Sequence, residues 1–159
     1  MNIKAIETKY GGCKFRSRLE ARWAVFFDAL HWHWAYEPEG FQLDSGWYLP
    51  DFLVHIDRPC TGKGDRWIEV KPFKKEETDC PIDARWQELA KGSGIPIMTV
   101  YGMHRAGDGC DAAWKKKEAR PHAGRISVQG ETPTLLGPVW TEDPFTDAWN
   151  AASSERFGT

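Results

Sequence analysis

The sequence has few cysteines, and none of them stands in a close pair. Cys13, Cys60, Cys80 and Cys110 are widely spaced, and no C-x-x-C motif occurs. Zinc sites usually draw their ligands from close pairs, so this spacing argues against structural zinc. We interpret the four residues as reduced thiols of a cytosolic protein.

The chain also lacks an export or membrane signal. Residues 1–12 contain no apolar signal core, and no apolar run approaches the length that spans a bilayer. We therefore expect a cytoplasmic protein with no membrane partner. The formal net charge of −2 does not by itself indicate a nucleic-acid binder. It does not exclude one either, because acids at a metal site offset basic residues in the sum and local patches matter more.

The composition is that of a folded protein. Of the 159 residues, 41% are hydrophobic and nine are tryptophan, which is enough for one core and an appended C-terminal segment. We expect a core with an N-terminal arm at 1–101, and an extension at 102–159 packed on the same domain. The extension holds scattered glycines and prolines, and we expect it to contain loops, a short strand at 125–128 and a helix at 146–157. It could form a substrate-facing flap, a homodimer contact or a cover for the sheet edge.

Hydrophobic periodicity predicts the order of the elements. A helix begins at Ser17, where Ser17 and Glu20 form a capping box, and its apolar residues recur at helical spacing. Alternating residues at 32–37 predict a strand, on whose half-exposed surface we place His31 and His33. The remaining expected elements are a hairpin of 41–43 with 47–56 around 44–46, a loop at 57–64, a strand at 65–71, a loop at 73–81, a helix at 82–91 and a strand at 95–101.

The stretch from Tyr48 to Lys71 contains the candidate chemistry. Pro50 lacks an N–H and suits the start of a strand, so regular pairing begins or opens near Asp51. On the following strand Glu69 and Lys71 share one face because side chains alternate. Asp51 and Glu69 on neighbouring strands can hold one hard cation such as Mg²⁺ between them, to which the Val70 carbonyl could add an oxygen. Lys71 would orient a water or neutralise a phosphate, although an edge-strand charge is the alternative explanation.

Pro50-Asp51 followed by Glu69-Val70-Lys71 resembles the signature of the PD-(D/E)XK nucleases. The upstream stretch Phe15-Arg16-Ser17-Arg18-Leu19-Glu20 resembles the first-helix motif of phage junction-resolving endonucleases and transposon end-cleaving nucleases. The resemblance extends from Phe15 to Tyr101. It implies an α/β, restriction-endonuclease-like αβββαβ core with a mixed central sheet flanked by helices, followed here by an irregular C-terminal extension. It also suggests a phage or mobile-element gene, acting in the cytoplasm of a bacterial host.

Glu20 therefore has two candidate roles, a helix cap or a fourth catalytic residue and metal ligand beside Asp51, Glu69 and Lys71. Basic residues surround the expected site and could contact DNA mainly through its backbone. These candidate DNA-binding residues are Lys14, Arg16, Arg18, Arg22, Lys74 and Lys75.

The sequence thus predicts a DNA endonuclease that hydrolyses phosphodiester bonds with Mg²⁺, for which Mn²⁺ would substitute. Selectivity for branched or junction DNA is one option for this activity. Two alternatives remain open at this stage. The chain could be a catalytically silent nuclease-like fold that acts as a DNA-binding or assembly module, or a small-molecule hydrolase that uses the same carboxylates.

Overall fold

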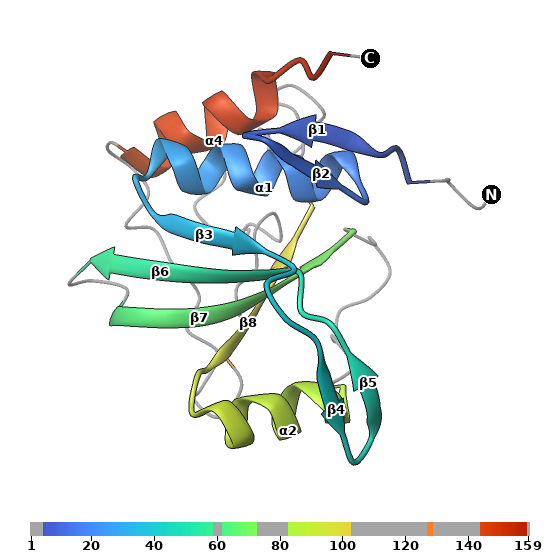
Figure 1. Ribbon diagram of the computed structural model, residues 1–159. Helices are drawn as coiled ribbons and strands as arrows, with labels where there is room; N and C mark the ends of the chain where they lie inside the picture. Colours follow the sequence, from blue (N-terminus) through green and yellow to red (C-terminus); the bar gives the residue numbers. More distant parts are fainter. Residues whose placement is uncertain (1–4, 59–61, 73–82, 103–126, 129–143, 159) are drawn as a thin grey trace, which may run out of the picture.

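A five-stranded mixed β-sheet forms the centre of the computed structural model, which describes residues 5–58, 62–72, 83–102, 127–128 and 144–158 (Figure 1). β7 and β8 run parallel, and the other neighbouring strands run antiparallel. The mixed α/β sheet expected from the sequence is confirmed. Its strands lie in the order β3 (His33–Tyr36), β6 (Phe52–Arg58), β7 (Gly62–Lys71), β8 (Ile97–Tyr101) and β9 (Ser127–Val128).

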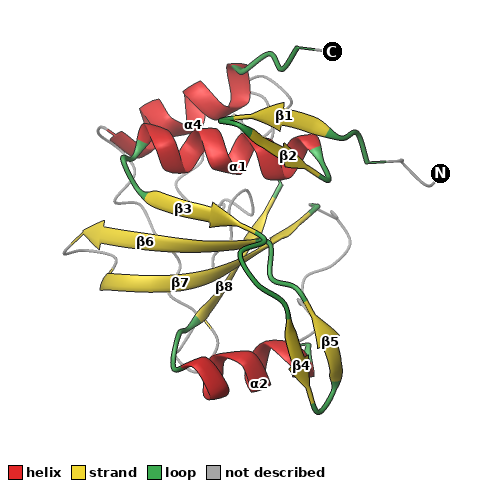
Figure 2. Ribbon diagram, viewed as in Figure 1, coloured by secondary structure: helices red, strands yellow, loops and turns green. Residues whose placement is uncertain are grey.

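Helices cover both faces of this sheet (Figure 1). Helices α1 (Arg18–Ala29) and α4 (Pro144–Ser154) pack against each other on one face, and α2 (Ala84–Ser93) lies on the other. Along the chain, the elements of this layered core follow the order α1, β3, β6, β7, α2 and β8. Figure 2 shows the helices in red on either side of the yellow strands.

Side chains alternate along the central strands and divide the apolar residues between two clusters. Phe52, Val54 and Ile56 of β6 join Ile68 and Val70 of β7 in the cluster under α1. The opposite face of β7 carries Trp67, which packs with Trp86 and Leu89 of α2. This alternation places Glu69 and Lys71 on the α2 face of the sheet. Their position on one shared face agrees with the sequence prediction.

The expected boundaries of α1 are nearly correct. Ser17 caps the helix, because its hydroxyl accepts the Glu20 N–H at 3.1 Å. The helix ends in a Schellman turn, in which the His31 N–H bonds the Asp28 carbonyl and the Trp32 N–H bonds the Phe27 carbonyl. His31 has a φ of +57° and lies in this turn, so its expected place on a strand surface was wrong.

Two small hairpins lie outside the central sheet. The first, β1 (Thr8–Tyr10) with β2 (Cys13–Phe15), was missed by the sequence interpretation, which expected a polar arm there. The second, β4 (Phe41–Leu43) with β5 (Gly46–Tyr48), was expected. However, the predicted strand 47–56 is divided, since residues 49–51 separate β5 from β6 and each half belongs to a different sheet.

Other predicted boundaries shift because pairing overrides local signals. The loop expected at 57–64 is shorter, since Asp57 pairs with Lys63 and Arg58 with Gly62. Helix α2 begins at Ala84 behind an Asp83 cap, and β8 begins at Ile97. In the C-terminal segment, the expected strand and final helix correspond to β9 and α4.

Part of the C-terminal segment belongs to the same core as the α1 face of the sheet. Ala148 and Ala152 of α4 are fully buried in the cluster that includes Trp23 of α1. The predicted division at 101/102 stays a prediction.

Within the part of the chain that the structure describes, no helix is long and apolar enough to cross a membrane. Cys13 is a free thiol, and the other three cysteines lie outside the described residues.

Candidate active site

Asp51 lies at the point where β6 and β7 stop pairing. Trp67 donates its N–H to Pro96, and Lys71 accepts the Gly102 N–H, so the odd-numbered backbone groups of β7 face β8. The even-numbered groups therefore face β6, where Phe52 pairs with Ile68. Continuing this register brings Pro50 opposite Val70.

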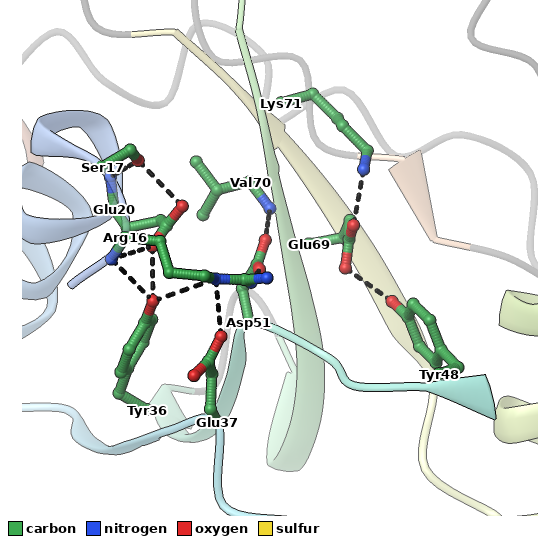
Figure 3. Close-up of polar contacts among 10 residues, drawn as sticks. All are labelled: Arg16, Ser17, Glu20, Tyr36, Glu37, Tyr48, Asp51, Glu69, Val70 and Lys71. Carbon is green, nitrogen blue, oxygen red and sulfur yellow. Dashed lines mark hydrogen bonds and ion pairs between the residues drawn. The ribbon is translucent and has the colours of Figure 1, made fainter. Parts of the chain in front are cut away.

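Pro50 has no N–H and cannot bond the Val70 carbonyl, so the ladder opens at this pair. The Asp51 side chain takes over the other half of the pairing, because its Oδ2 accepts the Val70 N–H at 2.7 Å (Figure 3). The Pro-Asp step therefore fixes a buried carboxylate beside a main-chain carbonyl that lacks its usual strand partner. This arrangement explains locally why a proline precedes Asp51.

Glu69 lies on β7 one residue beyond Ile68, the last residue that pairs with β6 (Figure 3). Its side chain is held at both oxygens: Tyr48 donates its hydroxyl to Oε2 at 2.5 Å, and Lys71 Nζ contacts Oε1 at 2.5 Å. Lys71 also lies 5.5 Å from the centre of the Trp86 ring. Glu69 is therefore a buried carboxylate whose two oxygens face a neutral donor and a cation.

Glu20 approaches Asp51 from the first turn of α1 and is also buried. Its Oε1 accepts the Ser17 hydroxyl at 2.8 Å, and its Oε2 accepts the Tyr36 hydroxyl at 2.6 Å. The expected return bond to the Ser17 N–H was wrong, because Oε2 instead accepts the Arg16 N–H at 3.1 Å. Glu20 thus belongs to the cap and to the carboxylate group at the same time.

Arg16 bridges the acids of this region. Its Nη2 lies 2.5 Å from Asp51 Oδ1, and its Nε lies 2.6 Å from Glu37 Oε1 (Figure 3). The same Nε donates to the Tyr36 hydroxyl at 3.4 Å. In this structure the predicted DNA-binding residue Arg16 is therefore an ion-pair partner of Asp51.

The electrostatics of the site reflect acids buried close together. Burial, followed by the charges of Glu69 and Glu20, raises the pKa of the Asp51 carboxyl to about 7, against the opposing effects of the Val70 N–H and Arg16. Burial and Glu69 raise the pKa of Tyr48. That hydroxyl consequently remains a hydrogen-bond donor at physiological pH.

The donor set fits a hard divalent cation in chemical kind. Asp51, Glu69 and Glu20 offer carboxylate oxygens, and the Val70 carbonyl lies on the β6 side of β7, where Pro50 has no N–H to donate to it. As they are placed, however, no group of three or more acidic, histidine or cysteine side chains among the described residues is arranged to hold a metal ion. Arg16 and Lys71 instead provide the positive charge next to Asp51 and Glu69.

The other predicted basic residues are more dispersed. Lys14 forms an exposed ion pair with Glu7, and Arg18 is exposed at the start of α1. Arg22 is half-buried further along the same helix. Lys74 and Lys75 lie outside the described residues.

Several residues of the site were not identified from the sequence. Tyr36, Glu37 and Tyr48 each contact an acid or Arg16 through their side chains. The alternation of 32–37 could have placed Tyr36 on the sheet face under α1, but no sequence signal pairs Tyr48 with Glu69. Arg85 was also missed; it lies 5.4 Å from the Tyr48 ring and pairs with Asp83.

The chain matches no protein-family model, and neither a curated protein nor a solved structure matches it.

Proposed function

We propose that this protein is a metal-dependent DNA endonuclease of the PD-(D/E)XK type. The observation that supports this most strongly is the Pro50-Asp51 opening beside Glu69 and Lys71. There, three carboxylates including Glu20 are buried within one small region at the end of paired strands. Buried acids destabilise one another without a cation, and functional sites commonly contain such groups.

The fold is compatible with this proposal. The order α1, β3, β6, β7, α2, β8 is compatible with the αβββαβ core that the sequence resemblance implies. Glu20 lies on the first helix, Asp51 directly before the second strand and Glu69 on the third. We propose that 1–101 forms the nuclease core, and that 102–159 extends it. Fold similarity alone does not define an activity, so the proposal depends on the residues of the site.

The ligands of the proposed Mg²⁺ or Mn²⁺ are Asp51, Glu69, Glu20 and the Val70 carbonyl. A bound divalent cation would stabilise the charge on the phosphate and make a water more acidic. Asp51 would exchange its contact with Arg16 for the cation, and Glu69 would turn one oxygen from Lys71 toward it. Tyr48 would keep the second oxygen of Glu69 in place through its hydroxyl.

Lys71 is the residue suited to orient the attacking water. Once released from Glu69, its ammonium would orient the water or neutralise charge on the reacting phosphate, which is a positioning role that needs a cation on a strand. The Lys71 ammonium lies 5.5 Å from the centre of the Trp86 ring, and this contact favours a position on the α2 face of the sheet. Contacts to DNA would be mainly to the backbone, from the basic residues named above.

One observation favours a second candidate function. Arg16 and Lys71 already neutralise Asp51 and Glu69, as they would in a silent nuclease-like module that binds DNA without a metal ion. The two functions differ in their response to divalent cations.

Cleavage assays test the proposal directly. The protein is incubated with supercoiled plasmid, single-stranded DNA and a four-way junction, each with Mg²⁺, with Mn²⁺ and with EDTA. We expect cleavage of at least one substrate with either cation and none in EDTA. Binding without cleavage under all conditions would instead support the silent module, and cleavage in EDTA would exclude the proposed mechanism.

A further inference from the structure

Glu37 lies next to the proposed site but has no role in the mechanism above. It follows the last residue of β3, and its N–H bonds the Asp51 main-chain carbonyl at 2.9 Å. Its backbone has a φ of +44°, in the left-handed region that side chains other than glycine, asparagine and aspartate rarely adopt. This conformation accompanies the placement of its carboxylate against Arg16 (Figure 3).

Arg16 is held from two sides by different parts of its guanidinium. The inner nitrogen, Nε, lies 2.6 Å from Glu37 Oε1 as an ion pair and donates its N–H to the Tyr36 hydroxyl. A terminal nitrogen, Nη2, contacts Asp51 Oδ1. An arginine that only neutralised Asp51 would not need the second carboxylate. With Glu37 in place, Arg16 retains a partner after Asp51 is lost to another cation.

The geometry points to Glu37 as a positioning residue for Arg16. We propose that when Asp51 takes a divalent cation, Glu37 keeps Nε of Arg16 at the site, while the terminal nitrogens turn from Asp51 to a phosphate of the substrate. Terminal guanidinium nitrogens match phosphate oxygens in a two-pronged geometry that a lysine does not reproduce. This inference rests on the proposed function, since it needs both a cation and a nucleic-acid phosphate.

The same contacts make Arg16 a competitor of the metal ion. Nη2 occupies Asp51 Oδ1, and 55% of the Arg16 side chain is exposed, so it can leave without disturbing the core. Arg16→Ala should therefore bind Mn²⁺ without DNA at least as tightly as the wild type. A weaker Mn²⁺ affinity in calorimetry, with an unchanged melting temperature, would contradict the exchange of partners at Asp51.

A substitution at Glu37 can distinguish a simple charge effect from positioning of Arg16, because the two predict opposite changes in DNA affinity. Removing a negative charge near the proposed DNA-binding surface should by itself tighten DNA binding, because DNA is a polyanion. If Glu37 positions Arg16, Glu37→Gln should instead weaken binding by roughly five- to tenfold, the size of coupling expected for contacting residues. Glu39→Gln is the matched control, since Glu39 is exposed and two residues away and carries the same charge change.

The experiment measures fluorescence anisotropy of a labelled duplex and a labelled four-way junction with Ca²⁺, for Glu37→Gln, Arg16→Ala, the double variant and Glu39→Gln. We expect Glu37→Gln to weaken binding only when Arg16 is present, and Glu39→Gln to leave it unchanged or tighter. Equal effects of Glu37→Gln in both backgrounds, or tighter binding by that variant, would overturn the inference alone. A wild-type protein that binds neither DNA would overturn the inference and the proposed function together.

Discussion

The Tyr48 hydroxyl donates to Glu69 Oε2 at 2.5 Å, and both residues are buried. This bond ties the end of β5, in a hairpin outside the central sheet, to the C-terminal part of β7. It also leaves the other Glu69 oxygen facing Lys71. A tyrosine therefore determines which oxygen of Glu69 can exchange its partner.

Tyr48→Phe should destabilise the protein by about 1–3 kcal/mol, because the variant leaves a buried carboxylate oxygen without its donor. It should also lower the affinity for Mn²⁺, since Glu69 loses its fixed orientation. Chemical unfolding and calorimetry measure the two effects. The ring stays in its apolar cluster in this variant, so a loss much larger than this range would indicate a packing role instead.

Glu20→Gln separates the cap from the proposed metal ligand. The amide can still accept from Tyr36 and Arg16 and donate to Ser17, so stability should change by less than about 1 kcal/mol. Cleavage and Mn²⁺ affinity should fall, because a neutral amide binds hard cations weakly. Ser17→Ala should cost about 1 kcal/mol through the lost cap. Parent-like cleavage by Glu20→Gln at limiting Mg²⁺ would restrict Glu20 to capping.

The raised pKa of Asp51 predicts how stability depends on pH. The folded protein binds this proton more tightly than the unfolded chain, so stability falls as pH rises from the usual carboxyl range through about 7. In EDTA, Asp51→Asn should therefore melt above the wild type at about pH 8 and lose this advantage near about pH 4. Adding Mn²⁺ at the higher pH should stabilise only the wild type. The measured quantity is the melting temperature of Asp51→Asn minus that of the wild type. If this difference is smaller at alkaline than at acidic pH, the result would contradict the destabilisation of the charged Asp51 by burial and by the neighbouring acids.

Pro50→Ala tests the Val70 carbonyl as a ligand. The new N–H faces Val70 and should extend the β6–β7 ladder by one pair, which would occupy the carbonyl. We expect hydrogen exchange to show protection of this amide and cleavage to fall by about tenfold. Pro38→Ala, at an exposed position before β4, is the control. Unchanged cleavage with a protected amide would remove the carbonyl from the ligand set.

Much of the fold follows from local signals in the sequence. The apolar stripe of α1 and its Ser17 cap are recognisable because both arise within one helical segment. The hairpin at 41–48 and the alternation of β6 and β7 are equally local. The break at 49–51 was not predictable from periodicity, because it depends on β5 and β6 joining different sheets.

The site was only partly predictable for the same reason. Asp51, Glu69 and Lys71 lie in a short motif whose strand faces can be read from alternation. The contacts of Tyr48 with Glu69 and of Arg16 with Glu37 join residues 21 positions apart in each pair, across different elements. Such pairs are determined by tertiary packing and leave no local pattern.

The cleavage rate of Glu69→Gln tests the central claim most directly. The amide still accepts the Tyr48 hydroxyl, so the variant should fold, but it removes a charge that the cation needs. We predict that the wild type nicks supercoiled plasmid at a rate that depends on Mg²⁺, and that Glu69→Gln is slower by about a hundredfold or more. Equal nicking rates for the two proteins over a Mg²⁺ titration would contradict a carboxylate-held cation as the source of the activity.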